Sequence, residues 1–188
     1  MKVVAFNGSP RKDGNTTILI KHVFRELEKE GIETELVQLS DKVIHGCIAC
    51  EKCGENRDQR CAVKNDAANE YIEKMLDADG IILGSPVYLQ DVTSEMKALI
   101  DRAGYVSRSN GRMLKKKVGA SVVAVRRSGA NHAIDTINHF FLSGQIVIVG
   151  RAIGFGRAKG EVEKDAEGIE LAKSLGQRMA WLLVKLHG

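Results

Sequence analysis

The sequence predicts an α/β fold with a doubly wound, five-stranded parallel sheet in the strand order 2-1-3-4-5. Short apolar runs alternate five times with amphipathic stretches of helical period, which is the pattern of parallel strands joined by crossover helices. The length of 188 residues and the apolar fraction of 44% allow one sizeable core and are small for two. We therefore expect a single domain over residues 1–188.

The local patterns place each element. Strands are expected at residues 2–6, 33–38, 80–84, 117–125 and 145–149. Helices are expected at residues 16–30, 66–78, 94–103, 131–142 and 161–186. Gly31 is the expected C-cap of the first helix. Because ligands of such sheets bind outside the carboxyl ends of the strands, the loops after strands one, three and four are the expected binding loops.

Two connections are long and have no expected regular structure. The longer one, at about residues 40–65, contains all four cysteines and reads as an insertion after the second strand. The other covers residues 104–115 and is rich in Ser, Arg, Asn and Gly. Long irregular segments in a compact domain usually carry function, so the cysteine segment is a candidate site.

The composition excludes several classes of protein. Charged residues make up 28% of the chain, which is typical of a folded, soluble protein rather than a disordered one. The apolar runs are far shorter than the roughly 20 residues of a membrane span, and the N-terminus does not read as a secretion signal. The net charge of +4 is modest, and the lysines at 115–117 suit a solvated approach to a strand. We expect a cytoplasmic protein with no membrane or nucleic-acid partner.

A loop suited to a phosphate group follows the first strand. It reads NGSPRKDGNTT over residues 7–17 and leads into a helix, so it offers hydroxyls, backbone N–H groups and a positive helix end. It lacks the glycine patterns of dinucleotide folds and nucleotide hydrolases, which favours a phosphomonoester. The alternative is that the loop only caps the helix and forms turns. The expected phosphate donors are Ser9, Arg11, Asn15, Thr16 and Thr17.

The same loop carries a family resemblance. The stretch GSPR at residues 8–11, followed by GNT at 14–16, resembles the phosphate loop of the NADPH-dependent FMN reductase and flavodoxin-like quinone reductase superfamily. That superfamily also shows Ser-Pro-x-Tyr after the third strand and then a helix with Lys and Asp-Arg, matched here by SPVY at 85–88, Lys97 and DR at 101–102. The resemblance implies a flavodoxin-like fold that binds flavin mononucleotide (FMN).

Two further loops are expected along the flavin ring. The loop after the third strand can lay flat apolar surface and backbone donors against one ring edge, through Ser85, Pro86, Val87 and Tyr88. An ordinary turn with a packing tyrosine is the alternative. The loop after the fourth strand carries two arginines where similar proteins are richer in glycine, and a nearby arginine would stabilise an anionic reduced flavin. The expected contacts are Arg126, Arg127, Ser128 and Gly129, with surface arginines of no special role as the alternative.

The cysteines form a compact motif, C-x2-C-x2-C-x7-C, at Cys47, Cys50, Cys53 and Cys61. In a cytoplasmic protein such thiols stay reduced and are metal ligands first. Four sulfur ligands suit zinc or an iron-sulfur cluster, and three cysteines at two-residue gaps favour a [4Fe-4S] cubane. Zinc, metal-free thiols and an adventitious disulfide remain alternatives.

Together with the FMN loops, the cysteine motif resembles that of the archaeal and bacterial iron-sulfur flavoproteins over nearly the whole chain. The resemblance implies one [4Fe-4S] cluster and one FMN per subunit, with electrons passing between them inside a homodimer or homotetramer. The motif departs from that of bacterial ferredoxins in its longer last gap and in Ala62, where those proteins have proline. Because such clusters are oxygen-labile, an aerobic preparation can lack this one.

The sequence therefore predicts an FMN-dependent oxidoreductase whose cluster relays single electrons, with the flavin rather than a side chain performing the chemistry. A cluster-free NAD(P)H-dependent FMN or quinone reductase is one alternative, and a flavodoxin-type carrier without a substrate is another. The electron donor is open between ferredoxin and NAD(P)H. The acceptor is open as well.

Overall fold

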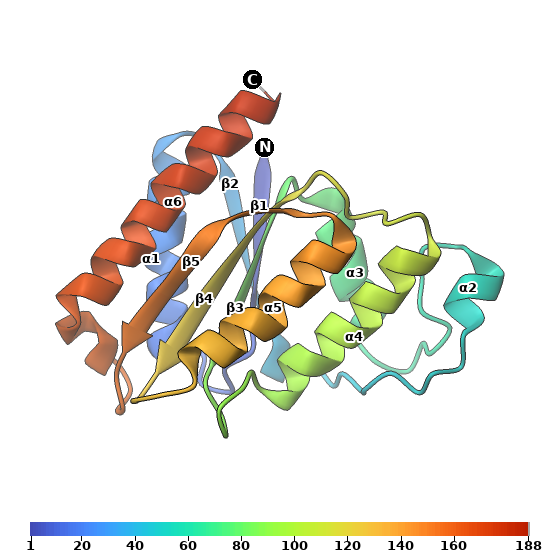
Figure 1. Ribbon diagram of the computed structural model, residues 1–188, viewed down its shortest axis with the longest axis horizontal. Helices are drawn as coiled ribbons and strands as arrows, with labels where there is room; N and C mark the ends of the chain where they lie inside the picture. Colours follow the sequence, from blue (N-terminus) through green and yellow to red (C-terminus); the bar gives the residue numbers. More distant parts are fainter. Residues whose placement is uncertain (188) are drawn as a thin grey trace.

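The computed structural model describes residues 1–187 and confirms the expected fold (Figure 1). Five parallel strands form one sheet in the order β2-β1-β3-β4-β5, as expected. The strands are β1 Lys2–Asn7, β2 Glu33–Gln38, β3 Gly80–Pro86, β4 Val118–Val125 and β5 Val147–Phe155.

Helices cover both faces of the sheet. The longer ones are α1 Asn15–Lys29, α3 Ala68–Asp77, α4 Ser94–Ser109, α5 Ala130–Gly144 and α6 Ala166–His187. Alternate residues of β1 enter opposite cores: Val3 packs in the core with α1 and α6, and Val4 packs in the core with α3, α4 and α5. Among residues 1–187, none of the helices combines the length and the hydropathy that a membrane span requires.

The largest differences from the expected bounds are in α4 and β5, which run farther, and in α6, which begins at Ala166 rather than at residue 161. Helix α4 continues through Gly104 to Ser109, because Val106 and Ser107 are buried and their packing outweighs the low helix propensity of glycine. Strand β5 begins at Val147 rather than residue 145 and extends to Phe155. Its internal glycines hid this length, and at Gly154 an added Cβ would lie 2.6 Å from a methyl of Val162.

The cysteine segment begins at the carboxyl-end rim of the sheet with the short 3-10 helix η1 Leu39–Asp41. It then runs outward to the far side of α4, where it forms the five-residue helix α2 Lys52–Asn56 (Figure 1). Helix α2 was not predicted from the sequence, and its flanking residues Glu51 and Arg57 both adopt left-handed backbone conformations. The segment is therefore a structured insertion that packs against α4.

Candidate functional site

A cavity of about 170 Å³ lies at the carboxyl ends of the strands. Its lining comes from the loops after β1, β3 and β4, so the three loops singled out in the sequence do meet. The loop after β5 contributes as well, which the sequence reasoning missed. The lining residues are Ser9, Arg11, Gly14, Asn15, Thr16, Pro86, Val87, Tyr88, Ala124, Arg126, Gly156 and Arg157.

Asn7, fully buried at the end of β1, fixes the first loop. Its Nδ2 donates to Thr17 Oγ1 at 2.9 Å and to Gln38 Oε1 at 2.8 Å, and its Oδ1 accepts from the Ser9 N–H at 3.0 Å. The backbone N–H of Gly8 donates to the carbonyl of Gly84 on β3 at 2.7 Å. These bonds hold the β1 loop against its neighbouring strands.

Thr16 is the unpartnered group at this loop. Thr16 lies in the first turn of α1, and only 1% of the residue's surface is exposed. Its Oγ1 has no hydrogen-bond partner in the described chain. Within residues 1–187, no side chain caps the helix end at Gly14, so the first backbone N–H groups of α1 are open as well. Free N–H groups, a hydroxyl and the positive helix end together make an anion site.

The other expected phosphate donors divide into two groups. Ser9 and Arg11 line the cavity, and Arg11, Arg126 and Arg157 give it three positive charges with no carboxylate among its lining residues in the described chain. Thr17 Oγ1 instead donates to the Lys12 carbonyl at 2.6 Å, so its hydroxyl shapes the loop.

Asn15 connects the first loop to the loop after β5. Its Nδ2 donates to the carbonyls of Gly156 at 3.2 Å and Ala158 at 3.0 Å. The signal that marks this fourth loop is the stretch GFGR at residues 154–157, where glycines and an arginine stand at a strand end. The amide of Asn15 thus holds one wall of the cavity in place.

The β3 loop presents Pro86, Val87 and Tyr88 to the cavity. Ser85 is fully buried behind them: its Oγ donates to the Pro86 carbonyl at 2.8 Å and accepts from the Thr93 N–H at 3.1 Å. Tyr88 and Asp91 close a tight turn through backbone bonds of 2.8 and 3.1 Å. Ser85 therefore supports the surface that Pro86, Val87 and Tyr88 expose.

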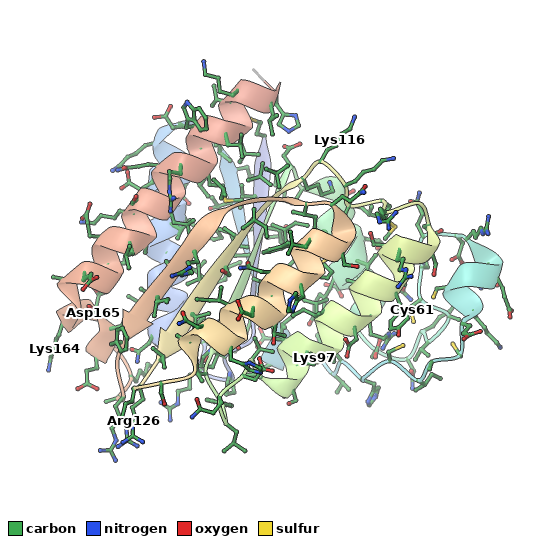
Figure 2. All side chains as sticks on the ribbon, in the orientation of Figure 1. Cys61, Lys97, Lys116, Arg126, Lys164 and Asp165 are labelled. Carbon is green, nitrogen blue, oxygen red and sulfur yellow. The ribbon has the colours of Figure 1, made fainter. Side chains whose placement is uncertain are left out.

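In the β4 loop, Arg126, Arg127 and Ser128 are exposed, and only Arg126 lines the cavity. Figure 2 shows Arg126 projecting from the carboxyl-end rim. Gly129 has φ of 91°, and a Cβ there would lie 2.9 Å from the backbone of Gln90, so only glycine fits between these two loops.

A second cavity, of about 90 Å³, contains all four cysteines in its lining. Cys47 and Cys50 are exposed, Cys53 is half-buried and Cys61 is buried, and all four are free thiols. Within residues 1–187, no three His, Cys, Asp or Glu side chains form a group able to hold a metal ion. The motif therefore gathers around one cavity without closing on a single ion.

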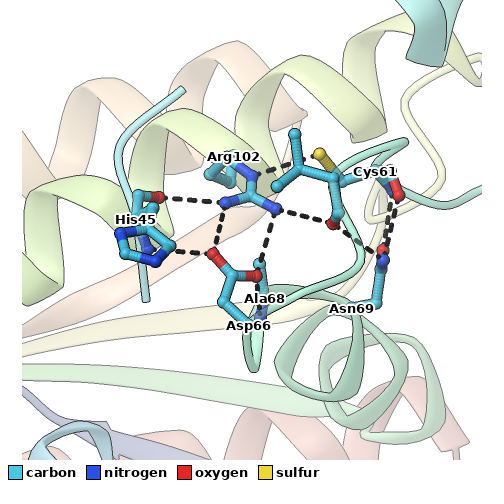
Figure 3. Close-up of polar contacts among 7 residues, drawn as sticks. His45, Cys61, Asp66, Ala68, Asn69 and Arg102 are labelled. Atoms are coloured by element: carbon cyan, nitrogen blue, oxygen red, sulfur yellow. Dashed lines mark hydrogen bonds and ion pairs between the residues drawn. The ribbon is translucent and has the colours of Figure 1, made fainter. Parts of the chain in front are cut away.

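Arg102 of α4 is buried beside this cavity and forms an ion pair with Asp66. Their side chains are 1% and 0% exposed, and Nη1 lies 2.8 Å from Oδ2. Burial alone would raise the pKa of Asp66, but hydrogen bonds from Arg102 and from the N–H groups of His45 and Ala68 hold it below its usual range. The pair therefore stays charged inside the protein (Figure 3).

Known proteins resemble this chain over most of its length. The family model described as NADPH-dependent FMN reductase matches residues 1–160. An iron-sulfur flavoprotein of Methanocaldococcus jannaschii is 39% identical, with 96% of each chain covered. The chain belongs to the iron-sulfur flavoproteins of the NADPH-dependent FMN reductase family. An iron-sulfur flavoprotein of Methanosarcina thermophila is 33% identical over 97% of this chain and 95% of the relative.

Solved structures agree on the flavodoxin-like fold of this family member. RosB with a bound 8-demethyl-8-formylriboflavin-5'-phosphate intermediate superposes with a TM-score of 0.81 at 21% identity, covering 99% of this chain and 80% of RosB. The NAD(P)H:quinone oxidoreductase of Methanothermobacter marburgensis gives 0.74 at 14% identity, with coverages of 95% and 96%. By its family, the chain is a flavin-dependent oxidoreductase.

Helix α4 of this flavoprotein runs from the rim of the sheet to the cysteine cavity. Thr93, its N-cap, lies at the rim and donates from Oγ1 to the Gly8 carbonyl at 2.9 Å. Arg102, beside the cysteines, lies nine positions later, which corresponds to about 14 Å along the helix axis. The cysteine segment thus starts at the same rim as the first cavity but places its thiols away from it.

Proposed function

We propose that this chain is an electron-transfer oxidoreductase that binds one FMN in the rim cavity and one [4Fe-4S] cluster on Cys47, Cys50, Cys53 and Cys61. The observation that carries the proposal is that all four thiols line one cavity, in a family whose relatives are named iron-sulfur flavoproteins. We infer that residues 1–188 act as one flavodoxin-like domain with the cysteine segment as its insertion, in the cytoplasm.

The rim cavity fits FMN by the chemistry of its donors. The orphaned Thr16 hydroxyl, the open N–H groups of α1 and the arginine at position 11 suit a doubly charged phosphate. Pro86, Val87 and Tyr88 suit the apolar face or edge of a flat ring. The remaining proposed contacts in the cavity lining are Ser9, Asn15 and Arg126. The other predicted contacts lie outside this lining and stay predictions: Thr17, Ser85, Arg127, Ser128 and Gly129.

The cysteine cavity fits a cluster better than a zinc ion. Thiolates around one tetrahedral zinc lie about 2.3 Å from the metal and so about 3.8 Å from one another. A cubane needs its four sulfur ligands farther apart, because the cluster itself lies between them. Four thiols around one cavity, with no group able to hold a single ion in residues 1–187, match the second arrangement.

When bound, the flavin supplies two-electron chemistry and the cluster supplies one-electron transfer. The described residues supply the rest. The Ala49 N–H donates to Cys47 Sγ at 3.4 Å, which orients a ligand that faces solvent. Arg126 places positive charge at the mouth of the rim cavity, where it favours an anionic ring.

The arrangement of the two cavities bears on the redox partner. Cys47 and Cys50 are exposed, so a cluster on them would meet an incoming partner at the protein surface. In Figure 1, α4 lies between helix α2 of the cysteine segment and the loops at the carboxyl ends of β3 and β4. We propose a homodimer or homotetramer that brings the cluster of one subunit toward the FMN of another, with ferredoxin or NAD(P)H as donor.

Anaerobic purification with absorption spectra and iron, sulfide and flavin assays tests the proposal. We expect about four irons and one FMN per chain. Flavin without iron or sulfide, after anaerobic reconstitution, would replace the proposal by a cluster-free NAD(P)H-dependent FMN or quinone reductase. One zinc per chain would make the cysteine site structural. Turnover of NAD(P)H with a quinone separates a reductase from a flavodoxin-type carrier.

A further inference from the structure

Arg102 has the largest fully buried side chain among the described residues. A guanidinium is costly to remove from water unless hydrogen bonds and an opposite charge compensate for the lost hydration. Asp66 provides the charge, and its two oxygens would satisfy a good part of the guanidinium by themselves. The reason for burying an arginine here is therefore found in the acceptors of its remaining N–H groups.

All five N–H donors of Arg102 have acceptors. Nη1 donates to Asp66 Oδ2 at 2.8 Å and to the His45 carbonyl at 2.9 Å. Nη2 donates to Asp66 Oδ1 at 3.3 Å and to the Val63 carbonyl at 3.2 Å. The last donor, Nε, is directed at Cys61 Sγ at 3.1 Å. Figure 3 shows this fan of contacts.

The acceptors lie at both ends of the cysteine motif. His45 stands two positions before Cys47, and Val63 stands two positions after Cys61. One side chain of α4 therefore joins the two ends of the segment that carries all four thiols. Cys61 is also held by its backbone, because its N–H donates to Asn69 Oδ1 at 2.7 Å and its carbonyl accepts from Asn69 Nδ2 at 2.9 Å.

We propose that Arg102 is a positioning residue for the [4Fe-4S] cluster: it closes the ligand segment and donates an N–H···S hydrogen bond to Cys61 that raises the reduction potential of the cluster. The potential rises because a donor at a ligand sulfur stabilises the more negative, reduced state. This inference rests on the proposed function, since it assumes that the four cysteines hold a cluster.

Arg102→Lys tests it, because lysine keeps the positive charge but lacks the planar fork that reaches five acceptors. Arg108→Lys is the matched control, since Arg108 is an exposed arginine on the same helix. Both variants and the wild type are purified anaerobically. Iron and FMN per chain are measured, and the cluster's midpoint potential is found by EPR-monitored redox titration.

We expect Arg102→Lys to keep FMN, to hold less iron, and to shift the potential of the remaining cluster to more negative values, while Arg108→Lys behaves like the wild type. Unchanged iron content and potential in Arg102→Lys would overturn the proposal. A wild type that holds FMN but no iron or sulfide refutes the proposed function instead, so the two failures are distinguishable.

A second measurement covers the case in which Arg102→Lys fails to fold, seen as joint loss of FMN and of a cooperative melt. Wild-type protein carrying ¹⁵N at the arginine Nε is reduced, and the cluster is studied by pulsed EPR. We expect a weak coupling to one arginine nitrogen, since Nε lies 3.1 Å from the sulfur of a ligand. Absence of any arginine coupling in reduced, cluster-loaded protein overturns the inference.

Discussion

The rim cavity and the cysteine cavity differ in how many parts of the chain supply their linings. The rim cavity takes its lining from loops after four strands, and buried side chains such as Asn7 and Ser85 hold those loops from behind. The cysteine cavity takes its thiols from one stretch of 15 residues, and one buried ion pair ties that stretch to the core. A site spread over several loops can lose one contact and still bind its ligand, whereas a site concentrated in one segment depends on few groups.

The largest effect is expected from Cys61→Ala. The variant should lose the cluster while it keeps FMN, because Cys61 is a proposed ligand of the cluster and contributes nothing to the lining of the rim cavity. Iron, sulfide and flavin contents after anaerobic purification measure both outcomes together. Loss of FMN along with iron would break the comparison, since it would make the two sites one unit.

Asp66→Ala is expected to lower the free energy of unfolding by about 3–5 kcal/mol, because it leaves the buried charge of Arg102 without its partner. Asp101→Ala is the matched control. Asp101 pairs with Lys97 at 2.7 Å on the surface of α4, the helix that carries Arg102. Such exposed pairs contribute about 0.5 kcal/mol to stability. Urea unfolding of the metal-free protein measures both. Equal losses would show that the buried pair is not the anchor of the cysteine segment.

Thr16→Val is expected to weaken FMN binding about 10-fold or more, since it removes the hydroxyl that we propose as a donor to the phosphate. The flavin-free variant should be at least as stable as the wild type, because the Thr16 hydroxyl is buried without a partner. Thr17→Val should instead destabilise the flavin-free protein by about 1–3 kcal/mol, because Thr17 Oγ1 has two partners within the chain. Fluorescence titration with FMN and thermal melts separate the two; an unchanged affinity in Thr16→Val would remove that residue from the phosphate site.

The smallest expected effect is on how the stability of the protein depends on pH in the acid range. The pKa of Asp66 lies below its ordinary value in the folded chain, so its contribution to stability is complete above the unfolded pKa of about 4 and declines as the pH falls toward the folded one. One such group gives a slope of at most about 1.4 kcal/mol per pH unit. Urea unfolding of the metal-free protein from pH 6 to pH 3 should therefore show a shallower decline in Asp66→Asn than in the wild type. Parallel declines would assign the acid sensitivity to other carboxylates.

Much of the fold was predictable because its signals are local. The alternation of strand and helix patterns predicted the strand order. The end of α1 was predicted to within one residue: its C-cap is Glu30, and the expected cap, Gly31, is the next residue, with φ of 71°. The lengths of α4 and β5 were not, because burial of Val106 and the close approach at Gly154 depend on neighbours from other elements.

The site shows the same division. Three binding loops and four thiols were visible as motifs, since each motif occupies a few consecutive residues. The bond from Arg102 to Cys61 joins positions 41 residues apart, and in the sequence Arg102 is only part of an Asp-Arg pair on a helix. A buried arginine and its acceptors are brought together by the tertiary fold, which no spacing rule describes.

The contacts of α4 have a consequence for engineering. Thr93 at its start supports the loop at Gly8, and Arg102 in its middle supports the cysteines. The stretch from residue 45 to 66 is therefore not a portable cassette. Grafted onto another flavodoxin-like scaffold, it would need the host's corresponding helix to present an arginine about 14 Å along the helix axis from its N-cap. Transplanting α4 together with the cysteine segment would bring along the Arg102 contacts that hold the segment.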